Sequence, residues 1–159
     1  MRSAFLGCSV TKGADSLGIS FVEYMAKRNS FEYVKEAVNG TTLVDQGKDS
    51  YIRRMRDNIS KDEKFDGIIV QLSTNDATKK LPLGEISDSK DLDNFNTSTI
   101  AGAIEYIIGY SRETLDCPVI IYTGTKYDSP EYEEMVKLLP KLQEKWDIGV
   151  INLWENEVM

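Results

Sequence analysis

Histidine is absent from this sequence: none of its 159 residues is a histidine. Histidine is the side chain that most often acts as the general base of an enzyme, so the usual serine–histidine pair cannot be assembled from these residues alone. Cysteine is scarce as well. The two cysteines, Cys8 and Cys117, exclude a disulfide framework and show no metal-binding spacing. A reducing compartment, the cytoplasm, is therefore expected.

Long apolar runs and an excess of basic residues are also missing. No run approaches the roughly 20 apolar residues that a membrane-spanning helix needs, and Gly7 ends the N-terminal apolar run before it reaches signal-peptide length. Acidic residues outnumber basic ones, 26 to 19, and the net charge of −7 argues against nucleic acid as a partner. Gly47-Lys48 lacks the upstream glycine of a phosphate-binding loop. We therefore expect no membrane, no nucleic acid, no metal and no cofactor.

Short apolar runs alternate with helical patterns along the whole chain. Five of these runs are typical of strands: residues 4–6, 33–38, 67–72, 119–122 and 149–153. Strands that alternate with helices predict a parallel sheet covered on both faces. The fold class is therefore α/β. The 159 residues predict one domain, a three-layer α/β/α flavodoxin-like sandwich whose five parallel strands take the order 2-1-3-4-5.

Four helices fill the intervals between these strands. Apolar residues at helical spacing identify them: Phe21, Val22 and Met25 in the first, Ile52, Met55 and Ile59 in the second, Ile100, Ile104, Ile107 and Ile108 in the third, and Tyr132, Met135, Val136, Leu139 and Leu142 in the fourth. Asp49 is the expected cap of the second helix, and Thr97 or Ser98 that of the third. Residues 128–130 (Asp-Ser-Pro) should start the fourth helix, which Pro140 should kink.

Two features depart from this regular pattern. The long segment 77–97 is rich in Asp, Ser and Asn, which favours either a lid over a functional site or a disordered surface loop. No helix follows the fifth strand, and this topology leaves part of one apolar sheet face uncovered. We expect either that the sequence is a fragment with its last helix missing, or that a partner chain, such as a second copy in a homo-oligomer, covers that face.

Polar residues follow the first three strands, at the sheet edge where open parallel sheets bind their ligands. Ser9 follows the first strand, Gly40 the second and Asn75 the third. These strands are neighbours in the predicted order, so their loops should converge. Ser9 is the candidate nucleophile, and its own N–H, the Gly40 N–H and the Asn75 carboxamide are the candidate donors to an oxyanion. Gly40 suits this role because a residue without Cβ lets the backbone approach a ligand closely.

The same three loops resemble the first blocks of the SGNH, or GDSL-type, hydrolases. Gly7-Cys8-Ser9 resembles the family's Gly-Asp-Ser, Gly40 its glycine after the second strand, and residues 73–76 (Ser-Thr-Asn-Asp) its Gly-x-Asn-Asp. The resemblance follows the whole chain in order and spacing. It implies a serine-dependent hydrolase, an esterase or lipase acting on a small acyl ester or an acetylated sugar. It also implies that Ser9 is the nucleophile and that Ser9, Gly40 and Asn75 form the oxyanion hole.

The sequence departs from the family pattern in several blocks. Cys8 stands where the family has aspartate and Ser73 where it has glycine, but neither position supplies the nucleophile or an oxyanion donor. The family's fourth block, Asp-x-x-His beyond the fifth strand, is absent from the sequence, which ends at Met159. Because that block carries the family's base, we expect the chain to be truncated before it and to be nearly inactive as it stands.

Other interpretations of these residues stay open. A serine such as Ser9 in a strand-to-helix loop also suits a helix cap, and Asn75-Asp76 is a common turn pair. A non-catalytic ligand-binding domain of this fold needs no base. A flavodoxin-like domain would bind a cofactor phosphate at residues 9–13, before a helix N-terminus. Cys8 is expected to be a buried, small apolar residue rather than a reactive thiol.

Overall fold

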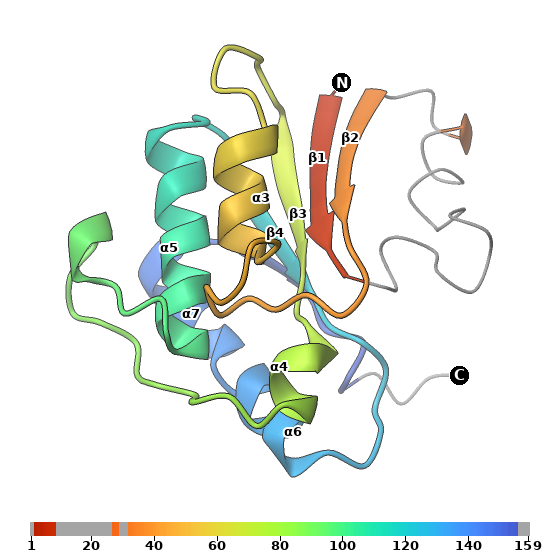
Figure 1. Ribbon diagram of the computed structural model, residues 1–159, viewed down its shortest axis with the longest axis vertical. Helices are drawn as coiled ribbons and strands as arrows, with labels where there is room; N and C mark the ends of the chain where they lie inside the picture. The colour runs from red at the N-terminus through yellow and green to blue at the C-terminus, as the bar shows by residue number, and fades with distance from the viewer. Residues whose placement is uncertain (1, 9–26, 29–31, 156–159) are drawn as a thin grey trace.

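The computed structural model describes residues 2–8, 27–28 and 32–155 and shows a five-stranded parallel sheet (Figure 1). The strand order is β2-β1-β3-β4-β5, as predicted. The strands are β1 (Arg2–Gly7), β2 (Glu32–Ala37), β3 (Gly67–Gln71), β4 (Val119–Tyr122) and β5 (Gly149–Ile151). All five expected strands are present, and their ends differ from the predicted ones by at most two residues. Each of these apolar runs forms a strand, and the inner strands β1, β3 and β4 are buried more completely than the edge strands β2 and β5.

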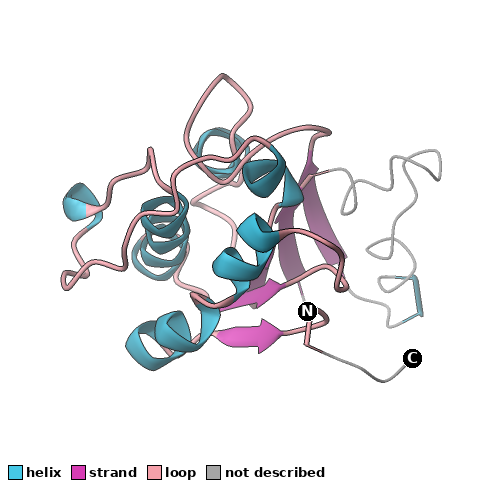
Figure 2. Ribbon diagram, turned by 90° about the horizontal axis from the view of Figure 1, so that it is seen from below, coloured by secondary structure: helices cyan, strands magenta, loops and turns pink. Residues whose placement is uncertain are grey.

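Helices cover one face of this sheet (Figures 1 and 2). They are α3 (Tyr51–Asn58), α5 (Ile100–Glu113), α6 (Pro130–Val136) and α7 (Leu139–Trp146), while the short α4 (Thr74–Thr78) follows β3 at the carboxyl end of the strands. Alternate strand residues such as Leu6, Val70 and Ile121 are buried against these helices. The expected first helix, with Phe21, Val22 and Met25, lies outside the described residues.

The structure corrects the predicted N-terminal caps of α3 and α5, since a neighbouring residue caps each of these helices. Ser50, not Asp49, caps α3, because its Oγ accepts from the Arg53 N–H at 3.2 Å. Thr99, not Thr97 or Ser98, caps α5, and its Oγ1 accepts from the Gly102 N–H at 3.1 Å.

Two prolines mark the starts of the helices α6 and α7. Ser129 caps α6 with Pro130 in the first turn, as predicted. Pro140 does more than kink this helix. It stands in the first turn of α7, so the expected single helix is two helices, because proline supplies no N–H to continue the first one.

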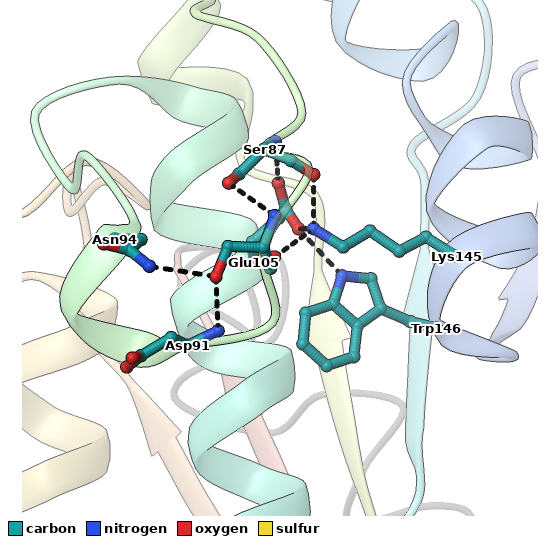
Figure 3. Close-up of polar contacts among 7 residues, drawn as sticks. Ser87, Asp91, Asn94, Glu105, Lys145 and Trp146 are labelled. Carbon is teal, nitrogen blue, oxygen red and sulfur yellow. Dashed lines mark hydrogen bonds and ion pairs between the residues drawn. The ribbon is translucent and has the colours of Figure 1, made fainter.

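Residues 79–99 connect α4 to α5 and contact the helical layer (Figure 3). The fully buried Glu105 carboxylate accepts from the Ser87 N–H at 2.6 Å and from Trp146 Nε1 at 2.9 Å. Lys145 pairs with the same carboxylate, and its Nζ donates to the carbonyl oxygens of Ser87 and Ser89, each at 2.6 Å. The segment is therefore a structured connection and not a disordered loop. Around Ser87 it lies on α5 and α7 rather than over the candidate site.

The sheet face opposite these helices is less completely covered in the described part of the chain. Ile69 and Ile120 are half-buried there, and Ile151 is 50% exposed. That a second copy covers this face stays a prediction. Among the described helices, none combines the length and the apolar character needed to cross a membrane.

Candidate active site

The nucleophile candidate, Ser9, lies outside the described residues, and the structure describes the chain up to its neighbour Cys8. Cys8 is a free thiol with no exposed surface, as predicted, and it belongs to the hydrophobic core. Its backbone N–H donates to Gln71 Oε1 at 2.9 Å. This bond joins the end of β1 to the end of β3 and fixes the position of Cys8 relative to β3.

Gly40 lies in the loop that follows β2, with a backbone φ of +74°. Only glycine adopts this left-handed conformation readily. A Cβ atom at this position would have no heavy atom of the described residues within 4 Å, so these residues leave the space beside the Gly40 backbone open. Lys79, at the end of α4, donates from Nζ to the Gly40 carbonyl oxygen at 3.3 Å. The loop after β2 is thus joined to the helix after β3.

Asn75 lies in the first turn of α4 and contacts the same loop. The Ser73 hydroxyl caps this helix by accepting from the Asn75 N–H at 3.0 Å. The Asn75 side chain donates from Nδ2 to the Thr41 carbonyl oxygen at 2.8 Å, and Ser73 Oγ donates to the same oxygen at 3.3 Å. The structure therefore brings Asn75 beside the residue that follows Gly40. Asn75 begins a helix rather than a simple turn.

Asp76 also holds the loop after β2, a role that the sequence did not suggest. Its carboxylate is fully buried and accepts from the backbone N–H groups of Leu43 and Val44 at 2.8 and 3.0 Å. Burial raises the pKa of this carboxyl above its usual value, and the backbone hydrogen bonds, which favour the charged form, offset only part of that effect. The pair Asn75-Asp76 thus holds the Gly40 loop through two separate side chains.

Arg54 is a second residue that sequence reasoning missed. It lies on α3 with only 4% of its surface exposed. Its Nη2 donates to the Gly7 carbonyl oxygen and to Thr41 Oγ1, both at 2.9 Å. The available signal was its position three residues after the buried Tyr51, on the helix face that packs against the sheet. A charged residue on a buried face requires a specific set of partners.

Two buried aromatic residues, Tyr132 and Trp154, lie beside the loops that follow β3 and β4. The buried Tyr132 hydroxyl donates to the Leu72 carbonyl oxygen at 2.8 Å and accepts from the Gly124 N–H at 2.9 Å. Burial raises the pKa of this phenol far above its usual value. Trp154, after β5, is 5% exposed and packs against the Tyr132 ring with centroids 5.2 Å apart. These rings are core residues, as expected for Trp154, and they fix the loops after β3, β4 and β5.

A small surface pocket adjoins Gly40. It measures about 150 Å³ and is lined by residues 40–42 and 46–50 together with Lys79. In the described part of the chain, His, Cys, Asp and Glu side chains do not gather into a group that could hold a metal ion.

Comparison with known proteins shows which fold this is. No protein-family model matches the chain, and no curated protein matches it. Solved structures do match. A protein described as a GDSL-like lipase from Bacteroides ovatus is 16% identical, with a TM-score of 0.72 over 99% of this chain and 87% of that one. The chain has the fold of the GDSL-type hydrolases.

Two further solved structures also match the chain. A possible lipase from Chitinophaga pinensis is 18% identical, with a TM-score of 0.76 over 98% of this chain and 68% of that one. A carbohydrate esterase whose active site displays divergent catalytic and non-catalytic binding functions is 15% identical, with a TM-score of 0.63 over 99% of this chain and 59% of that one. The resemblance to the GDSL fold inferred from the three loops is confirmed. The roles of Ser9, Gly40 and Asn75 remain predictions.

Proposed function

We propose that the chain forms the nucleophile and oxyanion parts of a serine-dependent ester hydrolase. In this proposal Ser9 attacks the acyl carbonyl carbon. The Ser9 N–H, the Gly40 N–H and the Asn75 carboxamide stabilise the negative charge that develops on the carbonyl oxygen. Removing one such donor typically slows catalysis about 10²- to 10³-fold, so three aligned donors provide most of the rate enhancement expected here.

The observation that carries this proposal is the bond from Asn75 Nδ2 to the Thr41 carbonyl oxygen at 2.8 Å. A carboxamide nitrogen has two N–H bonds. One of them reaches Thr41, which orients the amide group beside Gly40 and leaves the second N–H to point elsewhere. The open space beside the Gly40 backbone provides room for a ligand oxygen. The GDSL fold of the chain is consistent with this assignment.

The pocket beside Gly40 favours a small acyl group. Its volume of about 150 Å³ is well below the roughly 300–1,000 Å³ of pockets that enclose drug-sized ligands. An acetyl group fits such a space, whereas a long fatty acyl chain does not. We therefore propose a small acyl ester, or an acetylated sugar, as the substrate.

A base must remove the Ser9 proton, and these 159 residues contain no histidine. The experiment therefore supplies imidazole in solution as the base. Hydrolysis of p-nitrophenyl acetate and of glucose pentaacetate is measured against imidazole concentration, with Ser9→Ala as the background for direct imidazole catalysis. Wild-type protein should exceed that background, and Asn75→Ala should lose most of the excess. The control is Asn58→Ala, since the exposed Asn58 amide donates to Glu36, which is not one of the proposed site residues.

The absence of histidine favours a second function, non-catalytic binding at the same site. Such a protein binds an acylated ligand through the Gly40 and Asn75 donors without turnover. Equilibrium binding of glucose pentaacetate by calorimetry separates the two functions. Binding that Asn75→Ala abolishes, together with no Ser9-dependent turnover at any imidazole concentration, would replace the hydrolase proposal with this one.

A further inference from the structure

Arg54 bridges three segments that surround the candidate site. Its Nη2 donates to the Gly7 carbonyl oxygen and to Thr41 Oγ1, each at 2.9 Å, and its Nε donates to the Asp49 carbonyl oxygen at 2.9 Å. Gly7 is the last residue of β1, Thr41 follows Gly40, and Asp49 precedes the cap of α3. One planar guanidinium therefore fixes the relative positions of the first two site loops and of α3.

Burying this guanidinium is costly, and the structure compensates its charge only in part. Its side chain is 4% exposed, and Nη1 has no hydrogen-bond partner among the described residues. The Glu36 carboxylate oxygen Oε1 lies 3.8 Å from Nη1, which is too long for a hydrogen bond. The Tyr51 ring adds a cation–π contact at 5.4 Å. A residue that served only to fill the core would be apolar here, because an apolar side chain carries no desolvation cost.

Thr41 connects Arg54 to the remaining donor. Its hydroxyl accepts from Arg54 and donates to the Val38 carbonyl oxygen at 2.7 Å, while its own carbonyl oxygen accepts from Asn75. The contacts form a continuous series from the end of β1 through Arg54 and Thr41 to α4. Movement of Thr41 would displace both the Gly40 N–H and the Asn75 carboxamide.

We propose that Arg54 is a positioning residue that aligns the Gly40 and Asn75 oxyanion donors with the end of β1. This inference rests on the proposed function. A displacement of about 1 Å among reacting groups slows a reaction about 100-fold, so loss of the bridge should affect the chemical step more than ligand binding. Lysine has a single donor group in place of the planar fork and can hold only part of these contacts.

The test uses ethyl p-nitrophenyl methylphosphonate with imidazole. In this reaction a bond forms between Ser9 Oγ and phosphorus, the bond from phosphorus to the nitrophenyl oxygen breaks, imidazole takes the serine proton, and p-nitrophenolate leaves. Its colour gives the rate, and mass spectrometry locates the adduct. Arg54→Met should lower the limiting inactivation rate about 10- to 100-fold with little change in the half-saturating phosphonate concentration. Arg54→Lys should recover part of that rate.

The control is Arg56→Met, which removes the same charge from an exposed position of α3 and should leave both constants unchanged. Should Arg54→Met fail to fold by circular dichroism, Thr41→Val removes the other end of the bridge and should lower the limiting rate by itself. Equal limiting rates in wild type, Arg54→Lys and Thr41→Val would overturn the inference while leaving the hydrolase proposal intact. A wild-type protein without an adduct on Ser9 would overturn both.

Discussion

Gly40 and Gly47 form a matched pair for testing the oxyanion role of Gly40. Both have a positive φ, +74° and +73°, and a Cβ atom on either residue would meet no heavy atom within 4 Å in the part of the chain that the structure describes. An alanine at either position is therefore strained only by the left-handed backbone conformation, which costs about 1–2 kcal/mol. Gly40→Ala and Gly47→Ala should lower the free energy of unfolding by the same amount, measured by urea denaturation.

The two variants should differ in catalysis. In Gly40→Ala the added methyl group occupies the space where the substrate oxygen approaches the Gly40 N–H. Loss of one oxyanion donor slows catalysis about 10²- to 10³-fold, so the imidazole-dependent, Ser9-dependent hydrolysis of p-nitrophenyl acetate should fall by about 10²-fold. Gly47 lines the same pocket as Gly40 but is not one of the proposed oxyanion donors. Gly47→Ala should therefore change the KM for p-nitrophenyl acetate and keep the wild-type kcat at a temperature where both variants are folded.

Two results would contradict an oxyanion role for the Gly40 N–H. If Gly47→Ala lowered kcat as strongly as Gly40→Ala, the effect would come from loop strain and not from the loss of an oxyanion donor. If Gly40→Ala kept full activity, the Gly40 N–H would not contact the reacting oxygen.

Three further predictions concern stability, each measured by urea denaturation followed by circular dichroism. Because burial raises the folded-state pKa of Asp76, its contribution to the free energy of unfolding is largest below its unfolded pKa of about 3.9 and falls as the pH rises through the raised value. The difference between wild type and Asp76→Asn should therefore shrink as the pH rises from about 4, and growth of that difference would contradict the raised pKa. Glu105→Gln leaves the Lys145 ammonium without its buried counter-charge and should cost about 3 kcal/mol; a loss below about 1 kcal/mol would show that the pair is not needed. Thr99→Ala should cost about 1 kcal/mol and Ser98→Ala less than about 0.5 kcal/mol, and the reverse order would contradict the assigned cap.

Much of the fold could be predicted because its signals are local. Runs such as residues 67–72 and 119–122 are apolar and β-branched, and the intervals between strands show helical spacing. Right-handed crossovers then restrict the strand order to few alternatives. The helix caps were predicted less well, since Thr97, Ser98 and Thr99 all have suitable side chains and only the backbone path selects Thr99.

The site was predictable at the level of its loops but not of its contacts. The position of Gly40 and Asn75 after neighbouring strands indicated that their loops meet, and the bond from Asn75 to Thr41 shows that they do. The partners of Arg54 and Asp76 were not predictable. Asp76 contacts a residue 33 positions earlier in the chain, and Arg54 one 47 positions earlier, and neither separation corresponds to a local sequence pattern.

The conformation of residues 79–99, between α4 and α5, could not be predicted from the sequence either. Its composition, rich in Asp, Ser and Asn, is typical of a loop without fixed structure. Its conformation depends on Glu105 and Lys145, which are 40 residues apart in sequence and meet only when α5 and α7 are packed. A polar composition alone does not reveal that a buried carboxylate elsewhere will bind the backbone at Ser87.

The most direct measurement is a crystal structure of the protein after reaction with the phosphonate. We predict a covalent adduct on Ser9 whose phosphoryl oxygen lies about 2.7–3.1 Å from the Gly40 nitrogen and from Asn75 Nδ2. An adduct on another residue, or a Ser9 adduct whose phosphoryl oxygen contacts neither of these donors, would contradict this prediction.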